Sequence, residues 1–223
     1  MLQAIIYGRF TLLLFFVALM FLVIPLIPAD RATLSKSIDL LGLIIVLSCL
    51  RGITEKKRFF IFMIVLSVIN VTIGGSALLM AANPSFQMVV IGFRLLYYLL
   101  IFFSIMKYVL DKTPITSDKI AGALSGYIII GIIWAFIYAI FFIQNPENFT
   151  FSNPTISESH NWTVYFSFTT LTTLGYGDII PNTQAPQSYA VMEAMFGQIF
   201  LAVVIARLVA LQILHNKTES NQT

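Results

Sequence analysis

The chain has 223 residues, of which 58% are hydrophobic and only 10% are charged. A soluble domain carries about a quarter charged residues, so this composition excludes an ordinary globular protein and predicts an integral membrane protein. The formal net charge is +3. The basic residues are scattered between apolar runs, whereas a nucleic-acid-binding protein would cluster them on one face.

Six apolar runs follow one another along the chain, and each is predicted to be a transmembrane helix. A hydrocarbon core about 30 Å thick requires roughly 20 apolar residues in a helix. The six runs cover residues 10–27, 38–50, 59–82, 86–106, 120–143 and 187–214. The chain is therefore expected to be an all-α, multi-pass membrane protein.

Lysine and arginine are distributed unequally between the connectors of these runs. The connectors after the second and fourth runs are basic, whereas residues 144–186 contain no lysine or arginine. The basic residues concerned are Arg51, Lys56, Lys57, Arg58, Lys107, Lys112 and Lys119. Because cytoplasmic loops carry an excess of lysine and arginine, both termini are expected to be cytoplasmic and the connector at 144–186 external.

The external connector contains the sequence Thr-Leu-Gly-Tyr-Gly-Asp at residues 173–178. Two glycines flanking a tyrosine indicate a bent strip of backbone, because glycine adopts left-handed dihedral angles without steric cost. In such a strip, successive carbonyl groups can point the same way and replace the hydration shell of a permeating cation. Non-helical backbone at membrane depth needs cover from protein or water, which an oligomeric pore supplies.

This motif resembles the selectivity filter of the tetrameric potassium channel family, and the likeness extends over about residues 120–211. The resemblance implies six transmembrane helices, a re-entrant pore helix at residues 161–172 and a homotetrameric pore. It also implies that K+ binds at the filter carbonyl groups and the Thr173 hydroxyl. The implied K+-binding residues are Thr173, Leu174, Gly175, Tyr176 and Gly177. Independently, a motif that occurs once needs several chains to close a ring.

Four residues are candidates for supporting the filter: Tyr165, Phe166, Asp178 and Glu193. The resemblance implies that Leu174 packs behind the filter and that Tyr165 and Phe166 form an aromatic cuff around it. It also implies that Tyr165 donates a hydrogen bond to Asp178. The alternative for the two aromatic residues is an interfacial belt. Glu193, an ionisable residue within the last span, either braces the filter from behind or lies near the outer interface.

Gly197 lies in the last span at the position where many members of the family carry a gating-hinge glycine. The alternative is close helix packing, because small residues dominate the contacts between membrane helices. Glycine at position 197 fits both interpretations.

The first four spans resemble a voltage sensor in number and placement only. A sensor needs several arginines, because moving one charge through 100 mV supplies only about 2.3 kcal/mol. Arg94 is the only arginine in the fourth span, so we expect weak or absent voltage dependence. We hypothesise that Arg94 pairs with Asp39 of the second span. The expected units are a sensor-like domain at 1–115, a pore domain at 116–214 and a disordered cytoplasmic tail at 215–223.

The expected function is passive, potassium-selective conduction across a membrane. No enzyme chemistry, cofactor, small-molecule substrate or nucleic acid is expected; the partners are K+, the lipid bilayer and copies of the same chain. The last span is similar to that of small bacterial ion-channel proteins, which implies the bacterial inner membrane. The alternatives are a non-conducting receptor or regulatory subunit with a pore-like fold, and a potassium transporter subunit, although such transporters build their filter from four repeats in one chain.

Overall fold

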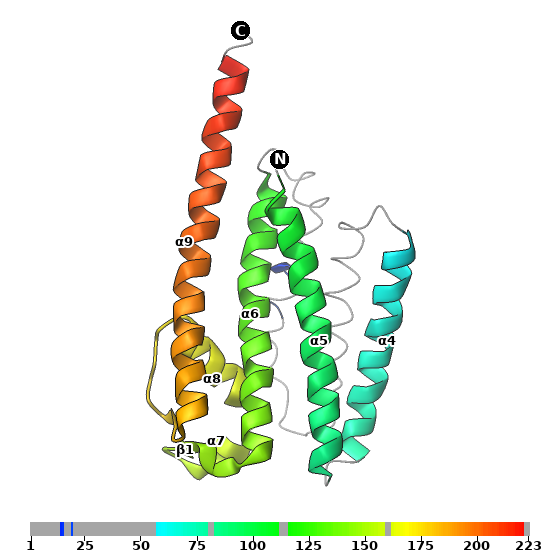
Figure 1. Cartoon of the computed structure of the whole chain (residues 1–223), viewed down its shortest axis with the longest axis vertical. Helices are drawn as coiled ribbons and strands as arrows, with labels where there is room; N and C mark the ends of the chain where they lie inside the picture. The colour runs from blue at the N-terminus through cyan, green and yellow to red at the C-terminus, as the bar shows by residue number, and fades with distance from the viewer. Residues whose placement is uncertain are drawn as a thin grey trace.

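The computed structural model describes residues 14, 15, 19, 57–79, 83–111, 116–158 and 162–220. Apart from residues 14, 15 and 19, the expected spans at 10–27 and 38–50 lie outside this part of the chain, and so does Asp39. The other four expected spans are helices. They are α4 (Lys57–Leu79), α5 (Pro84–Val109), α6 (Ser117–Gln144) and α9 (Gln184–Ser220), labelled as in Figure 1.

Three helices in the described part of the chain are long and apolar enough to cross a membrane. They are α5, α6 and the segment Gln184–Arg207 of α9. The apolar stretch described in α4, Ile61–Ile73, is shorter. Three of the six expected spans are thus found among the described residues.

Capping residues set the points at which α5 and α6 begin. The Asn83 side chain accepts a hydrogen bond from the Phe86 N–H at 3.3 Å, and Pro84 follows it in the first turn. At the start of α6, the Thr116 hydroxyl accepts from the Lys119 N–H at 3.3 Å. Both helices begin slightly earlier than predicted, because hydropathy alone does not register polar capping residues.

Helix α9 differs most from its predicted length. It continues to Ser220, whereas a disordered tail was expected from residue 215. Figure 1 shows its C-terminal part extending well beyond the ends of α5 and α6. The polar residues after Leu214 include no glycine or proline, so nothing in the sequence there terminates a helix.

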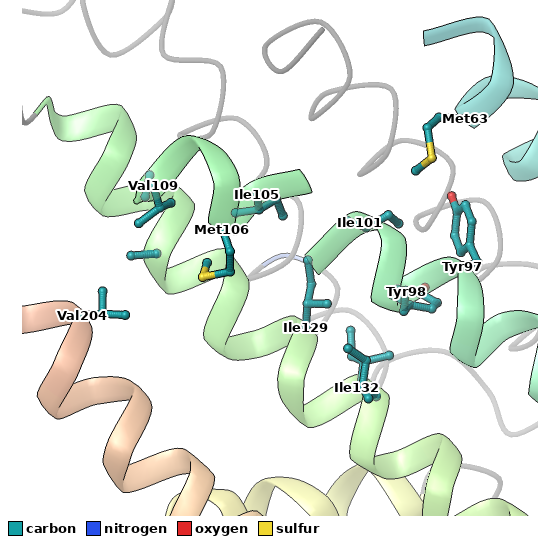
Figure 2. Packing of buried hydrophobic residues seen from close by; sticks show 13 residues of the cluster. Met63, Tyr97, Tyr98, Ile101, Ile105, Met106, Val109, Ile129, Ile132 and Val204 are labelled. Atoms are coloured by element: carbon teal, nitrogen blue, oxygen red, sulfur yellow. The ribbon is translucent and has the colours of Figure 1, made fainter. Parts of the chain in front are cut away.

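Two hydrophobic clusters hold the described helices together. The first lies between α5 and α6 and also takes in Met63 of α4 and Val204 of α9 (Figure 2). Within it, the hydroxyl oxygens of Tyr97 and Ser67 lie 3.0 Å apart and link α5 to α4. The second cluster is mostly aromatic and lies at the other end of α6. Its buried members are Ile130, Trp134, Tyr138, Phe149, Trp162, Phe166, Leu171 and Ile179.

The connector between α6 and α9 is compact. It contains a 3-10 turn, η2 (Pro146–Asn148), and two short helices, α7 (Pro154–Glu158) and α8 (Trp162–Leu171). Strands β1 (Phe149–Phe151) and β2 (Ile179–Pro181) pair antiparallel, with Thr150 opposite Ile180. Figure 1 shows this connector at the end of the molecule opposite to the C-terminus. The short helix α8 lies where the pore helix was expected; the sheet was not predicted.

Candidate functional site

Helix α8 leads directly into the glycine-containing motif. One side of α8 is buried against α6 and α9, through Phe166, Ser167 and Leu171 among others. Threonines at the end of α8 and just after it donate their hydroxyl hydrogens to backbone carbonyls: Thr170 to Phe166 at 2.8 Å and Thr172 to Phe168 at 2.7 Å. The helix therefore ends with its polar side chains bonded locally, and the chain turns at residues 172–173.

The backbone after α8 alternates in handedness. The φ angles of Thr173, Gly175 and Gly177 are 59°, 55° and 77°, and these are the only positive values in the described part of the chain. Leu174 and Tyr176 lie between them. Glycine adopts positive φ freely, but threonine does so at a cost, so Thr173 holds a strained conformation of the kind found at functional sites. The alternation is the geometry that the motif predicted.

A hydrogen bond to α8 fixes the orientation of this strip. The Gly175 N–H donates to the Thr169 carbonyl oxygen at 3.0 Å. Because this N–H points back toward α8, the strip is not a free surface loop. Its outward side chains are uncovered in the single chain: Leu174 is 56% exposed and Tyr176 is 67% exposed. Leu174, which the resemblance placed behind the filter, is thus not packed there within one chain.

Tyr165 and Asp178 lie on either side of the motif and contact each other. The Tyr165 hydroxyl donates to Asp178 Oδ2 at 2.7 Å, which is the contact that the resemblance implied. This hydrogen bond is the main reason that the pKa of Tyr165 is raised to about 12. The Tyr165 ring also lies parallel to that of Tyr176, with centroids 6.3 Å apart. One aromatic side chain therefore contacts both the tyrosine and the aspartate of the motif.

In the single chain, Phe166 does not lie against the motif, where a residue of the aromatic cuff was expected. It is buried, and its ring meets those of Tyr138 and Phe149 edge-on, with centroids 4.8 Å and 5.6 Å away. Neighbouring residues on a helix point about 100° apart, so Tyr165 and Phe166 cannot both face the motif of their own chain. Phe166 fastens α8 to α6 and β1.

The two-stranded sheet anchors the outer end of the motif. The Ser152 N–H, just after β1, donates to the Asp178 carbonyl at 2.8 Å. The Asn182 side chain, just after β2, donates from Nδ2 to Thr150 Oγ1 at 2.6 Å and to the Glu147 carbonyl at 3.1 Å. Sequence reasoning missed this anchor, although the apolar–polar alternation of Phe149–Phe151 is a weak strand signal.

Glu193 of α9 packs against α8. It is fully buried between α6, α8 and α9. Tyr138 Oη lies 2.6 Å from its Oε2, and Ser167 Oγ lies 2.5 Å from its Oε1. The Glu193 carboxyl group therefore contacts α8, the helix at the position expected for the pore helix. Tyr138 and Ser167 are site residues that the sequence did not single out.

Gly197 marks the closest approach of α9 to α8. A Cβ atom at this position would lie 2.4 Å from the Leu171 carbonyl oxygen and 3.0 Å from Leu171 Cδ1. The same carbonyl accepts a hydrogen bond from Tyr127 at 3.3 Å. Close packing therefore requires glycine here. The hinge interpretation is not needed to explain the residue.

The predicted pair of Arg94 and Asp39 falls partly outside the described residues. Arg94 lies in α5 and is partly buried, but Asp39 is not among the residues that the structure describes. The pairing stays a hypothesis.

Comparison with known families agrees with this geometry. Residues 124–212 match the model of a protein family described as ion channel, and this segment runs from α6 through α8 and the motif into α9. No curated protein and no solved structure matches the chain. The matched segment, the apolar helices on either side of it and the alternating backbone together identify an ion channel domain in a membrane protein.

Proposed function

We propose that this protein is a potassium-selective channel that conducts K+ passively down its gradient. The alternating backbone at residues 173–177 carries the proposal, because alternate positive φ angles turn successive carbonyl groups toward one side. The ligands are the carbonyl oxygens of Thr173, Leu174, Gly175 and Tyr176, with the Thr173 hydroxyl. K+ is the permeant ion, and no other cofactor or substrate is required.

We further propose that four identical chains surround the conduction path. A row of carbonyls from one chain covers one side of an ion only, and the motif occurs once in the sequence. In support, the side chains of Leu174 and Tyr176 are more than half exposed in the single chain. Helix α9 also presents a row of exposed apolar side chains, which are Val191, Met192, Met195, Phe196, Ile199 and Val203. Neighbouring chains and lipid would cover these surfaces.

The distribution of charge supports an orientation with the filter outside. The connector around the filter contains no lysine or arginine. At the opposite end, Arg207 of α9 donates a hydrogen bond to the Leu110 carbonyl, and Lys119 Nζ donates to the Asp111 carbonyl at 2.9 Å. Under the positive-inside rule this basic end is cytoplasmic, as are both termini of a six-helix chain in a bacterial inner membrane.

Flux into liposomes tests the proposal. Purified protein in K+-loaded vesicles should release K+ when an ionophore for protons carries the compensating charge, and Na+-loaded vesicles should release little. Gly175→Ala should abolish flux, because it places a side chain at a φ of 55°. Gly92→Ala is the matched control, since a Cβ at either position meets no atom within 4 Å but Gly92 does not have a positive φ.

Each other outcome excludes the proposal. Equal K+ and Na+ flux would indicate a non-selective channel. No flux from correctly folded protein would favour a non-conducting receptor or regulatory subunit.

A further inference from the structure

Glu193, Tyr138 and Ser167 form a polar cluster inside the membrane domain. All three residues are completely buried. Tyr138 lies on α6, Ser167 on α8 and Glu193 on α9, so the cluster joins three elements that are distant in sequence. Ser167 Oγ makes a second contact, to the carbonyl oxygen of Gly131 on α6 at 2.7 Å.

The contacts in this cluster need more protons than the two hydroxyl groups supply. There are three oxygen–oxygen contacts: Tyr138 Oη to Glu193 Oε2 at 2.6 Å, Ser167 Oγ to Glu193 Oε1 at 2.5 Å, and Ser167 Oγ to the Gly131 carbonyl at 2.7 Å. Each hydroxyl carries one hydrogen, and a carbonyl carries none. Two hydrogens cannot fill three two-centre hydrogen bonds, and a hydrogen on the Glu193 carboxyl group would supply the third.

An ionised carboxylate fits this arrangement poorly. It would leave either Ser167–Gly131 or Ser167–Glu193 as a contact between two oxygen lone pairs with no hydrogen between them. The charge would also be buried without a cationic partner: in the described part of the chain, no lysine or arginine lies within ion-pair distance of Glu193. A buried charge that lacks a partner costs far more free energy than one hydrogen bond returns.

We propose that Glu193 is a neutral carboxylic acid, which donates to Ser167 while Ser167 donates to Gly131 and Tyr138 donates to Glu193. Every hydrogen in this chain of bonds has one acceptor, and the chain ties the pore helix α8 to both flanking helices. Removing the proton at alkaline pH breaks one of the links. Conduction should then fall, a consequence that rests on the proposed function.

Among the residues that the structure describes, none near Glu193 would supply a compensating positive charge. On α6, the titratable residues near it are Tyr138 and Tyr127, both neutral at physiological pH. On α8, Tyr165 is bound to Asp178. On α9 itself, Tyr189 lies one turn earlier and packs on Trp134. Glu193 is therefore the one group of the cluster whose loss of a proton would create a charge in ordinary alkaline buffers.

Two substitutions of Glu193 in the full-length protein separate the neutral acid from the carboxylate. Glu193→Gln keeps a donor toward Ser167 and an acceptor for Tyr138, although its amide carries one hydrogen more than the neutral acid. It should be more stable to heat than Glu193→Leu, and its flux should be the same at neutral and alkaline pH, whereas the wild type loses flux several-fold at alkaline pH. Glu193→Leu removes both links and should lower the unfolding temperature by several degrees.

Infrared spectroscopy tests the protonation state without any need for conduction. The wild type in lipid should show the carbonyl stretching band of a protonated carboxylic acid at neutral pH, and this band should vanish in Glu193→Gln and on titration to alkaline pH. If the two spectra do not differ in this band, Glu193 is ionised and the proposal is wrong. It is equally wrong if Glu193→Gln is as unstable as Glu193→Leu, or if its flux falls with pH as in the wild type. Failure of the channel function itself would appear as no flux in any variant while the infrared band is still present.

Discussion

Replacing Gly197 with alanine tests how tightly α9 is packed on α8. The added Cβ would lie 2.4 Å from the Leu171 carbonyl oxygen and 3.3 Å from the Leu171 carbonyl carbon. Ordinary van der Waals contact for a Cβ begins near 3.4 Å, so the overlap with the oxygen is about 1 Å. The atom in the way belongs to the backbone and cannot turn aside as a side chain would. Either α8 or α9 must move.

The expected loss of stability follows from the size of this overlap. Overpacking a well-packed interior costs about 1–3 kcal/mol, and alanine regains roughly 0.5–1 kcal/mol over glycine through helix propensity. We therefore expect Gly197→Ala to destabilise the protein by about 1–2 kcal/mol, measured by denaturant unfolding in detergent. Because Leu171 lies two residues before the proposed filter, the displacement should also reduce K+ flux.

Gly92→Ala is the matched control for this experiment. It makes the same substitution within a helix, but its Cβ meets no atom within 4 Å. It should be neutral or slightly stabilising. If Gly197→Ala is as stable as Gly92→Ala, the close approach is not present. A change in open probability without any loss of stability would instead support the hinge interpretation of Gly197.

Three other predictions concern the filter support, the sheet and voltage. Tyr165→Phe should reduce K+ conduction, because it removes the hydrogen bond to Asp178. The donor is the neutral phenol of Tyr165, whose pKa is raised to about 12. The difference in K+ flux between the variant and the wild type should therefore be constant up to about pH 10 and disappear as the pH passes 12. A difference in flux that varies near neutral pH would contradict this assignment. Asn182→Ala should destabilise the sheet by about 1 kcal/mol and speed hydrogen exchange at Thr150, and unchanged exchange would mean that the side chain is not an anchor. Arg94→Gln should leave the conductance–voltage relation shallow and unchanged, because one charge supplies only about 2.3 kcal/mol per 100 mV. A steep conductance–voltage relation in the wild type would instead show that other residues carry gating charge.

Features with a strong local signal were predictable from the sequence. The helices α5 and α6 follow from unbroken apolar runs, and the alternation of φ at residues 173–177 follows from two glycines on either side of a tyrosine. The bond between Tyr165 and Asp178 followed from the resemblance to a family, since the spacing alone does not show that the two side chains meet.

Features that depend on tertiary contacts were not predictable in the same way. The strands β1 and β2 have three residues each and lie in different parts of the connector, so their pairing is visible only once the chain is folded. The partners of Glu193 come from α6 and α8, and an isolated tyrosine and serine in apolar runs gave no sign of them. Gly197 was ambiguous because a hinge and a close contact both favour glycine.

The reversal potential of single channels in a planar bilayer tests the central claim most directly. The bilayer separates a K+ solution from a Na+ solution. A filter formed by the carbonyls of residues 173–176 should then give a reversal potential close to that of a membrane permeable to K+ alone. Gly175→Ala should show no such current, whereas Gly92→Ala should behave as the wild type. A reversal potential near zero would mean that Na+ passes as easily as K+, and the assignment of this strip as a potassium filter would then be wrong.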